Sequence, residues 1–136
     1  MTPGAPPALP LHPRTGVAVL LWATDPAHAA LCATPFFHAA AAAALDVPVE
    51  MYFTSRSVLL LLPDNVRALR AGREGRTVAE YMQLARGEGV QFFACTDALA
   101  AQGVDPAAVR DGIDGFAGAA AFMARALDRD WTTLTY

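Results

Sequence analysis

The sequence lacks lysine altogether: its ten basic residues are all arginine, against 13 acidic residues, for a formal net charge of −3. This balance provides no general basic field, so we expect neither nucleic acid nor an anionic membrane surface as a partner. Long apolar runs are also missing. The longest, residues 17–23, 39–45 and 58–62, are far shorter than the roughly 20 residues of a membrane-spanning helix. The first residues form neither a basic nor a continuous apolar segment, and we expect no secretory signal.

Cysteine is scarce, with only Cys32 and Cys95 in 136 residues. Two cysteines do not make a disulfide framework, and we therefore expect a reducing, cytoplasmic location. Nucleotide-binding and hydrolase motifs are absent too. The sequence contains no GxGxxG after its first strand, no GxxxxGK[ST], no GxSxG and no HExxH, which excludes the common dinucleotide, phosphate-loop, α/β-hydrolase and zinc-protease interpretations.

A metal site also finds little support in the sequence. Cys32 and His38 are six residues apart, which places them about 240° apart on a single helix. Structural zinc normally takes four ligands, and no adequate fourth ligand accompanies these two residues and Cys95. We expect neither a metal nor a cofactor.

Proline separates the chain into two parts. Five of the ten prolines lie in residues 1–13, and we expect residues 1–15 to form a flexible tail before a single domain at 16–136. In that domain, β-prone apolar runs alternate with helix-forming segments. The expected strands are residues 16–23, 47–53, 90–94 and 131–136, and residues 112–115 are expected to be either a link or a very short strand. The expected longer helices are residues 35–45, 78–86, 97–102 and 116–127. Such alternation predicts a three-layer α/β/α sandwich with a mainly parallel sheet of about five strands.

Cys95 stands at the most informative junction in the chain, between the buried strand 90–94 and the helix 97–102. A thiol at the start of a helix meets unpaired N–H groups and a positive partial charge, and both favour the thiolate. Asp97 opposes this effect, although an acidic residue also suits the first turn of a helix. Either Cys95 or Thr96 could be the N-cap of this helix, and Thr96 is the better capping residue. The alternative for Cys95 is a small buried apolar residue.

Three further side chains are candidates for the same edge of the sheet, where the carboxyl ends of parallel strands gather. Arg56 follows the second strand and is suited to neutralising an anion or a persulfide, or else is simply solvated. His38 is a candidate base or donor near Cys95, with a packing boundary as the alternative. Cys32 is a candidate resolving thiol, with apolar packing as the alternative. The run 58–62, VLLLL, belongs either in the core or under another copy of the chain.

Several segments resemble the DsrE/DsrF-like (YchN-like) family of small sulfur-relay proteins. They are the opening strand with its Thr-Asp-Pro loop, FTSRSV at 53–58, ACTDALAAQGV at 94–104, and the closing GFAGAAAF and WTTLT segments, so the likeness spans about residues 16–136. The resemblance implies a persulfide-carrying cysteine at Cys95, assembly as a trimer or hexamer, and the parallel sandwich expected above. Thr96 and Asp97 depart from the small residues that usually follow this cysteine.

Together these features favour a cytoplasmic sulfur-relay protein. Its Cys95 would accept sulfane sulfur from a donor protein and pass it to an acceptor thiol. The N–H groups of Thr96 and Asp97 would support the thiolate, with assistance from Arg56 or His38. One alternative is a non-catalytic homo-oligomeric module that binds a small ligand or partner, consistent with the 54% apolar content. Another is a peroxiredoxin-like thiol protein, although the Thr-x-x-Cys arrangement of peroxiredoxins is absent.

Overall fold

The computed structural model describes residue 4 and residues 15–136, so the expected flexible tail at 1–15 lies almost wholly outside the described residues. The described part contains five strands: β1 Gly16–Leu21, β2 Val49–Phe53, β3 Gln91–Ala94, β4 Gly115–Phe116 and β5 Trp131–Thr135. Its α-helices are α1 Thr34–Ala44, α2 Pro63–Val66, α3 Val78–Gly87, α4 Thr96–Ala101 and α5 Ala119–Ala126. Short 3₁₀ helices are η1 Pro26–Leu31, η2 Ser55–Leu61, η3 Pro106–Ala108 and η4 Arg110–Gly112.

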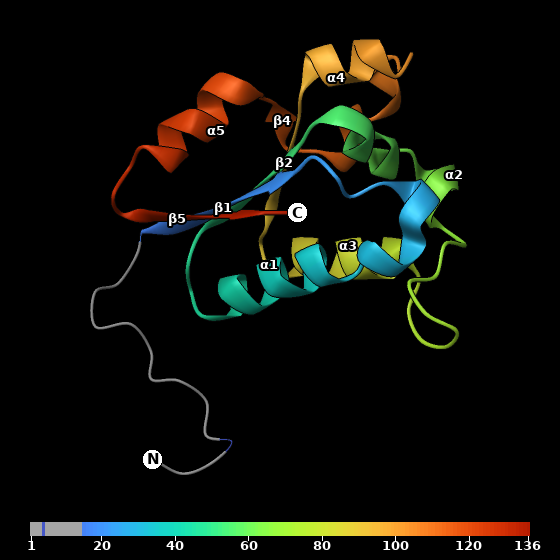
Figure 1. The fold of residues 1–136 in the computed structure, drawn as a ribbon, viewed down its shortest axis with the longest axis horizontal. Helices are drawn as coiled ribbons and strands as arrows, with labels where there is room; N and C mark the ends of the chain where they lie inside the picture. The colour runs from blue at the N-terminus through green and yellow to red at the C-terminus, as the bar shows by residue number, and fades with distance from the viewer. Residues whose placement is uncertain (1–3, 5–14) are drawn as a thin grey trace.

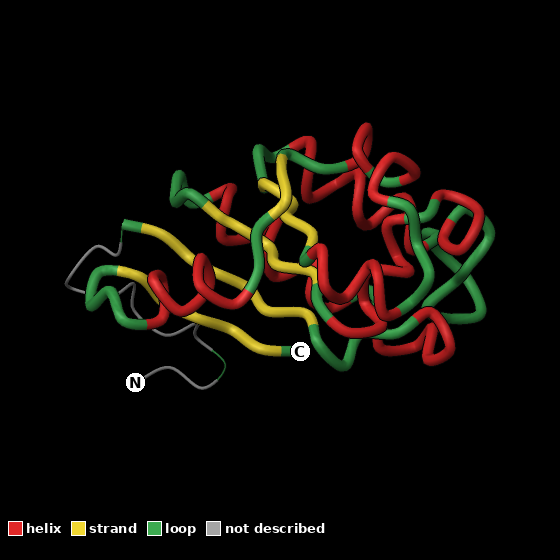
Figure 2. Tube along the Cα trace, turned by 90° about the horizontal axis from the view of Figure 1, so that it is seen from above, coloured by secondary structure: helices red, strands yellow, loops and turns green. Residues whose placement is uncertain are grey.

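The strands form one sheet in the order β4-β3-β2-β1-β5, and every neighbouring pair is parallel. Helices α1 and α3 lie on one face of this sheet and α5 lies on the other (Figure 1). Figure 2 shows the strands side by side, with the short helices and loops gathered beyond one end of the sheet. The predicted three-layer sandwich with a five-stranded parallel sheet is confirmed.

The face beneath α1 and α3 is a closed apolar core. Helix α1 buries Phe36 against Phe53 of β2 and Phe92 of β3, with ring centres 5.0–6.1 Å apart. All three rings are at most 1% exposed. Aromatic pairs at such separations add directional contacts to the free energy of burial, so this layer fixes the position of β2 and β3.

The face beneath α5 is built differently, because no residue of this helix is buried. A polar cluster attaches α5 to the sheet instead. Arg125 donates from Nε and Nη2 to the two carboxylate oxygens of Glu50 on β2, at 2.7 and 3.1 Å, and its guanidinium lies 3.9 Å from the ring centre of Trp131. Tyr52 donates its hydroxyl to the same carboxylate at 2.9 Å. The Glu50 side chain is 10% exposed, and such a buried charge is tolerated where it is paired and hydrogen-bonded.

Two expectations from the sequence are resolved by the chain's long-range contacts. The helix expected from residue 116 begins only at Ala119, because Gly115 and Phe116 instead pair with β3 as strand β4. The leucine-rich run 58–62 belongs to the core: most of it lies in η2, and Val58, Leu60 and Leu61 are at most 5% exposed. No second copy of the chain is needed to cover that run.

We expect the substitution Arg125→Met to destabilise the fold by about 1–3 kcal/mol, because the buried carboxylate of Glu50 loses two charge-assisted hydrogen bonds. Methionine retains apolar contact with Trp131, which isolates the ionic contribution. Urea unfolding at neutral pH measures the difference. The double variant Glu50→Gln/Arg125→Met should recover part of the loss, since no unpaired charge remains. If the loss of unfolding free energy in the double variant equals the sum of the losses in Glu50→Gln and Arg125→Met, the two side chains are not coupled and the prediction is contradicted.

Candidate functional site

The carboxyl ends of the strands stop at one level across the sheet. Leu21 pairs with Phe53, Phe53 with Ala94, and Ala94 with Phe116. Main-chain hydrogen bonds continue this ladder by one residue. The N–H groups of Thr54, Cys95 and Ala117 donate to the carbonyls of Leu21, Phe53 and Ala94, at 3.0, 3.0 and 3.1 Å. The residues immediately after β2, β3 and β4 are therefore brought into one row.

Cys95 occupies the centre of this row and is the N-cap of α4, with extended backbone angles. The expected preference for Thr96 as N-cap is wrong: Thr96 is the first residue of the helix. No side-chain capping bond is made at Cys95, so its sulfur accepts no hydrogen bond from the first turn. Thr96 and Asp97 are exposed, and Asp97 is the acidic residue of that turn. The helix ends at Ala101, and Gly103 is the C′ residue that the sequence predicts, with φ of 69°.

A cavity of about 270 Å³ opens beside the half-buried Cys95. The strand ends form one wall and the start of α5 forms the other. Gly118, the N-cap of α5, comes so close that a Cβ atom there would lie 3.3 Å from Cys95 Sγ. The cavity is lined by Leu20, Tyr52, Phe53, Thr54, Cys95, Ala117, Gly118, Ala119, Phe122 and Met123. The thiol therefore faces α5 rather than the helix that it caps.

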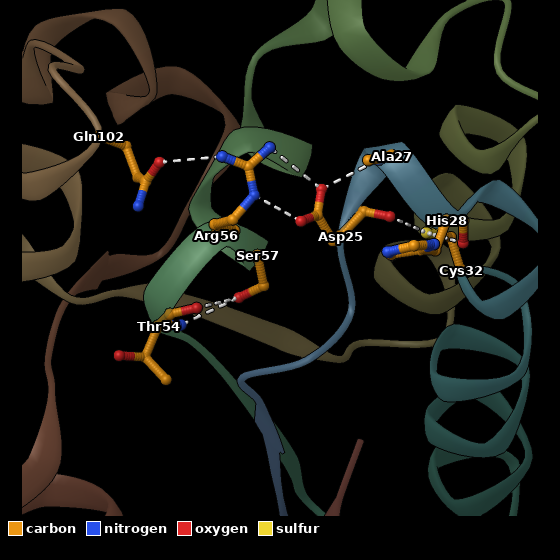
Figure 3. A network of polar contacts seen from close by, with 8 residues as sticks. All are labelled: Asp25, Ala27, His28, Cys32, Thr54, Arg56, Ser57 and Gln102. Carbon is orange, nitrogen blue, oxygen red and sulfur yellow. Dashed lines mark hydrogen bonds and ion pairs between the residues drawn. The ribbon is translucent and has the colours of Figure 1, made fainter.

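Arg56 belongs to a different polar network at the same edge (Figure 3). Its guanidinium donates to both carboxylate oxygens of Asp25, at 2.5 and 3.4 Å, and to the side-chain oxygen of Gln102 at 3.4 Å. The hydrogen bond from Arg56, followed by the one from the Ala27 N–H, lowers the pKa of Asp25. Arg56 thus joins the loops after β1 and β2 to the end of α4. None of these described contacts reaches Cys95.

Cys32 is fully buried at the end of η1. Its thiol donates to the main-chain carbonyls of Asp25 and His28, at 3.3 and 3.5 Å. Burial raises the pKa of Cys32 to about 11, so this thiol remains protonated at neutral pH. Both cysteines are free. The structure places Cys32 in the packing beneath the first loop, which is the alternative that the sequence left open.

His38 is exposed on α1, where its Nδ1 forms a hydrogen bond with the hydroxyl of Tyr136. Helix α1 and α5 lie on opposite faces of the sheet (Figure 1). The Cys95 cavity lies on the α5 side. Of the sequence candidates, the structure therefore brings together Cys95, Thr96 and Asp97, and it places Arg56, Cys32 and His38 in other contacts.

The residues that close the cavity, above all Gly118, Phe122 and Met123, were not singled out from the sequence. A helix beginning at residue 116 would place Gly118 inside its first turn and not over the thiol. The signal in the sequence that could have indicated these residues is a pair of glycines. Gly115 begins the short strand β4, and Gly118 is the N-cap of α5.

Among residues 4 and 15–136, no group of three or more His, Cys, Asp or Glu side chains is arranged to hold a metal ion. The same described part of the chain contains no helix with the length and apolar character needed to cross a membrane.

Comparison with known proteins identifies the family. The DsrE/DsrF-like family matches residues 17–135, nearly the whole chain. The chain belongs to the DsrE/DsrF-like family. A search of curated proteins finds no match for this DsrE/DsrF-like chain.

Solved structures share the fold of this DsrE/DsrF-like chain. The ychN protein from E. coli has a TM-score of 0.67 at 16% identity, over 89% of this chain and 99% of its own. A conserved protein of unknown function from Bacteroides thetaiotaomicron has a TM-score of 0.61 at 16% identity, over 88% and 94%. A protein of unknown function from Methanobacterium thermoautotrophicum has a TM-score of 0.57 at 22% identity, over 88% and 97%. At these identities the likeness establishes the fold.

The Asp25–Arg56 pair gives a prediction about pH. Because the pKa of Asp25 is lowered in the folded state, its ionised form stabilises the fold at pH values above the ordinary pKa of about 4. That stabilisation is lost as pH falls through the lowered pKa. Asp25→Asn retains an acceptor for the Ala27 N–H but removes the charge. We expect this variant to be less stable than the wild type at pH 7, and we expect the difference to shrink progressively as pH falls below 4, as measured by urea unfolding. A difference in unfolding free energy between the variant and the wild type that does not change as pH falls from 7 to below 4 would contradict the prediction.

A second prediction concerns the space around the thiol. Gly118→Ala places a methyl group against Cys95 Sγ, and we expect it to slow alkylation of Cys95 by iodoacetamide about tenfold, because the approach to sulfur is crowded. Gly87→Ala is the matched control, since a Cβ there meets nothing within 4 Å. Peptide mass spectrometry over time gives both rates. Equal rates in the two variants would show that Gly118 does not limit access.

Proposed function

We propose that this chain is a cytoplasmic sulfur-relay protein that carries sulfane sulfur as a persulfide on Cys95 and passes it to a partner thiol. The observation that supports this most directly is the position of Cys95. It is a half-buried thiol in the wall of a cavity at the carboxyl edge of the sheet, where open α/β folds bind their ligands. Membership of the DsrE/DsrF-like family supports the same chemistry.

The proposed cycle has two exchange steps. The Cys95 thiolate attacks the outer sulfur of a donor persulfide, so that a bond forms between Sγ and that sulfur. The sulfur–sulfur bond of the donor breaks, and the donor leaves as a thiolate. In the second step an acceptor thiolate attacks the outer sulfur now carried on Cys95. The acceptor becomes the persulfide, and Cys95 is released as a thiolate. Each step exchanges one bond for another and needs no external oxidant or reductant.

The proposed exchange at Cys95 depends on access to the sulfur and not on a neighbouring base. Cys95 Sγ receives no capping bond from α4, and Arg56 is held by Asp25. His38 contacts Tyr136. Exchange between thiols and persulfides proceeds without a dedicated base when the attacking thiol is accessible. The two-sided wall of the cavity then decides which donors reach Cys95.

A second candidate is a non-catalytic homo-oligomeric module. It is favoured by large apolar side chains that the single chain leaves in contact with solvent, namely Trp22 at 56%, Leu31 at 64% and Leu127 at 80% exposure. Apolar surface of this kind is typical of contact sites between chains. Assembly into a trimer or hexamer is compatible with both candidates. A chain that assembles while Cys95 remains unmodified by persulfide donors would be the module.

The decisive experiment is sulfur loading of the purified full chain. After incubation with a persulfide donor, we expect intact-mass and peptide spectra to show one additional sulfur on Cys95. Cys95→Ser should abolish the addition and leave the folded spectrum unchanged. Cys32→Ser should still load, because the fully buried Cys32, with its pKa of about 11, provides little thiolate at neutral pH. Loading that survives Cys95→Ser, or an unmodified Cys95 in the wild type, would refute the relay.

A further inference from the structure

Among the described residues, no charged side chain lines the cavity beside Cys95. Apart from the thiol, the lining consists of aliphatic and aromatic side chains, glycine and Thr54. Tyr52 contributes its ring, while its hydroxyl is engaged with Glu50 at 2.9 Å. Burial, together with this hydrogen bond, raises the pKa of Tyr52 to about 12, so the hydroxyl stays neutral. A ligand in this cavity therefore meets almost entirely apolar surface.

The charged groups behind the wall are already paired. Glu50 accepts two hydrogen bonds from Arg125 and one from Tyr52. Arg125 in turn lies over the ring of Trp131. Neither group is free to neutralise a charged ligand that enters from the Cys95 side. A sulfonate, carboxylate or ammonium group placed in the cavity would lose its hydration without gaining a partner, which is costly.

The volume sets the size of the occupant. A dry apolar cavity of about 150 Å³ accommodates benzene. At about 270 Å³, this cavity has room for a hydrocarbon group of benzyl size together with the sulfur atoms attached to it. Burying such a group is favourable because it removes apolar surface from water.

We propose that this cavity selects low-molecular-weight organic persulfides whose organic group is an uncharged hydrocarbon. The inference rests on the proposed relay function and names its donor class. The hydrocarbon group lies against Phe122, Met123 and Tyr52, and the outer sulfur meets Cys95 Sγ. The thiolate of Cys95 takes that outer sulfur, the donor's sulfur–sulfur bond breaks, and the donor leaves as an apolar thiolate that takes up a proton from solvent.

Methanethiosulfonates of different charge test the selectivity of the cavity. Each transfers its organic thio group to Cys95 as a disulfide and releases methanesulfinate, so only the transferred group differs. The benzyl and the 2-sulfonatoethyl reagents are applied to the full chain, and each rate is divided by that for free N-acetylcysteine. We expect the benzyl reagent to be favoured about tenfold or more. Equal normalised rates, or a faster sulfonate, would overturn the proposal.

Two positions on α5 provide the matched variants. Met123 lines the cavity and is 48% exposed, whereas Ala124, the next residue of the helix, is exposed and is not part of the lining. Met123→Glu brings a negative charge to the cavity wall and should reduce the benzyl preference at least threefold. Ala124→Glu should leave that preference unchanged. A loss of preference in Ala124→Glu as large as that in Met123→Glu would trace it to α5 as a whole and would overturn the assignment to the cavity.

Sulfur transfer itself separates this inference from the relay. Benzyl persulfide and glutathione persulfide, which carries several charges, are compared as donors by the mass gain on Cys95. Faster loading from benzyl persulfide supports both the relay and the donor class. Equal loading from both donors overturns the donor class and leaves the relay intact. If the thiosulfonate test shows a benzyl preference but neither persulfide transfers sulfur to Cys95, the relay is overturned. The proposed class of persulfide donor is then overturned as well.

Discussion

The parallel register of the sheet is the constraint on which the site depends. Because Leu21, Phe53, Ala94 and Phe116 lie side by side, the next residue of each strand emerges at the same level. This brings Thr54, Cys95 and Ala117 to one edge although they are far apart in sequence. A register shift of one residue would turn Cys95 to the opposite face of the sheet, toward the closed aromatic core. The position of one thiol is thus linked to main-chain pairing across four strands.

The two faces of the sheet serve different purposes. Beneath α1 and α3 the aromatic cluster around Phe36 is sealed, and it supplies the rigidity that keeps the strand ends aligned. Beneath α5 the contact is thin: the helix buries none of its residues and is held by the Glu50–Arg125 pair. A fully packed helix there would have filled the cavity. The incomplete layer leaves space beside Cys95, lined on one side by Phe122 and Met123 of α5.

The sequence was informative where chemistry and structure were both local. Short-range patterns predicted the strand before Cys95, the end of α4 just before Gly103 and the parallel alternation of strands and helices, and the structure agrees. It was uninformative where the outcome depended on register. Arg56 had the right position in the chain to serve an anion, but Asp25, 31 residues earlier, holds it. The position of Gly118 over the thiol could not be predicted from the sequence, because it arises only when β4 pairs with β3.

The sulfur of Cys95 lies apart from the polar contacts that the described residues make at this edge of the sheet. Cys95 has a helix start beside it, yet its sulfur receives no hydrogen bond from that helix, which is only six residues long. The polar residues at the same edge are engaged in joining loops: Asp25, Arg56 and Gln102 stabilise one another (Figure 3). What remains around the sulfur is shape and apolar surface. Such a site favours molecules whose dehydration costs the least free energy, because no charged side chain in the described part of the chain lines the cavity to compensate a charged ligand. Access to this thiol and the cost of desolvating a ligand beside it both depend on the wall that α5 contributes.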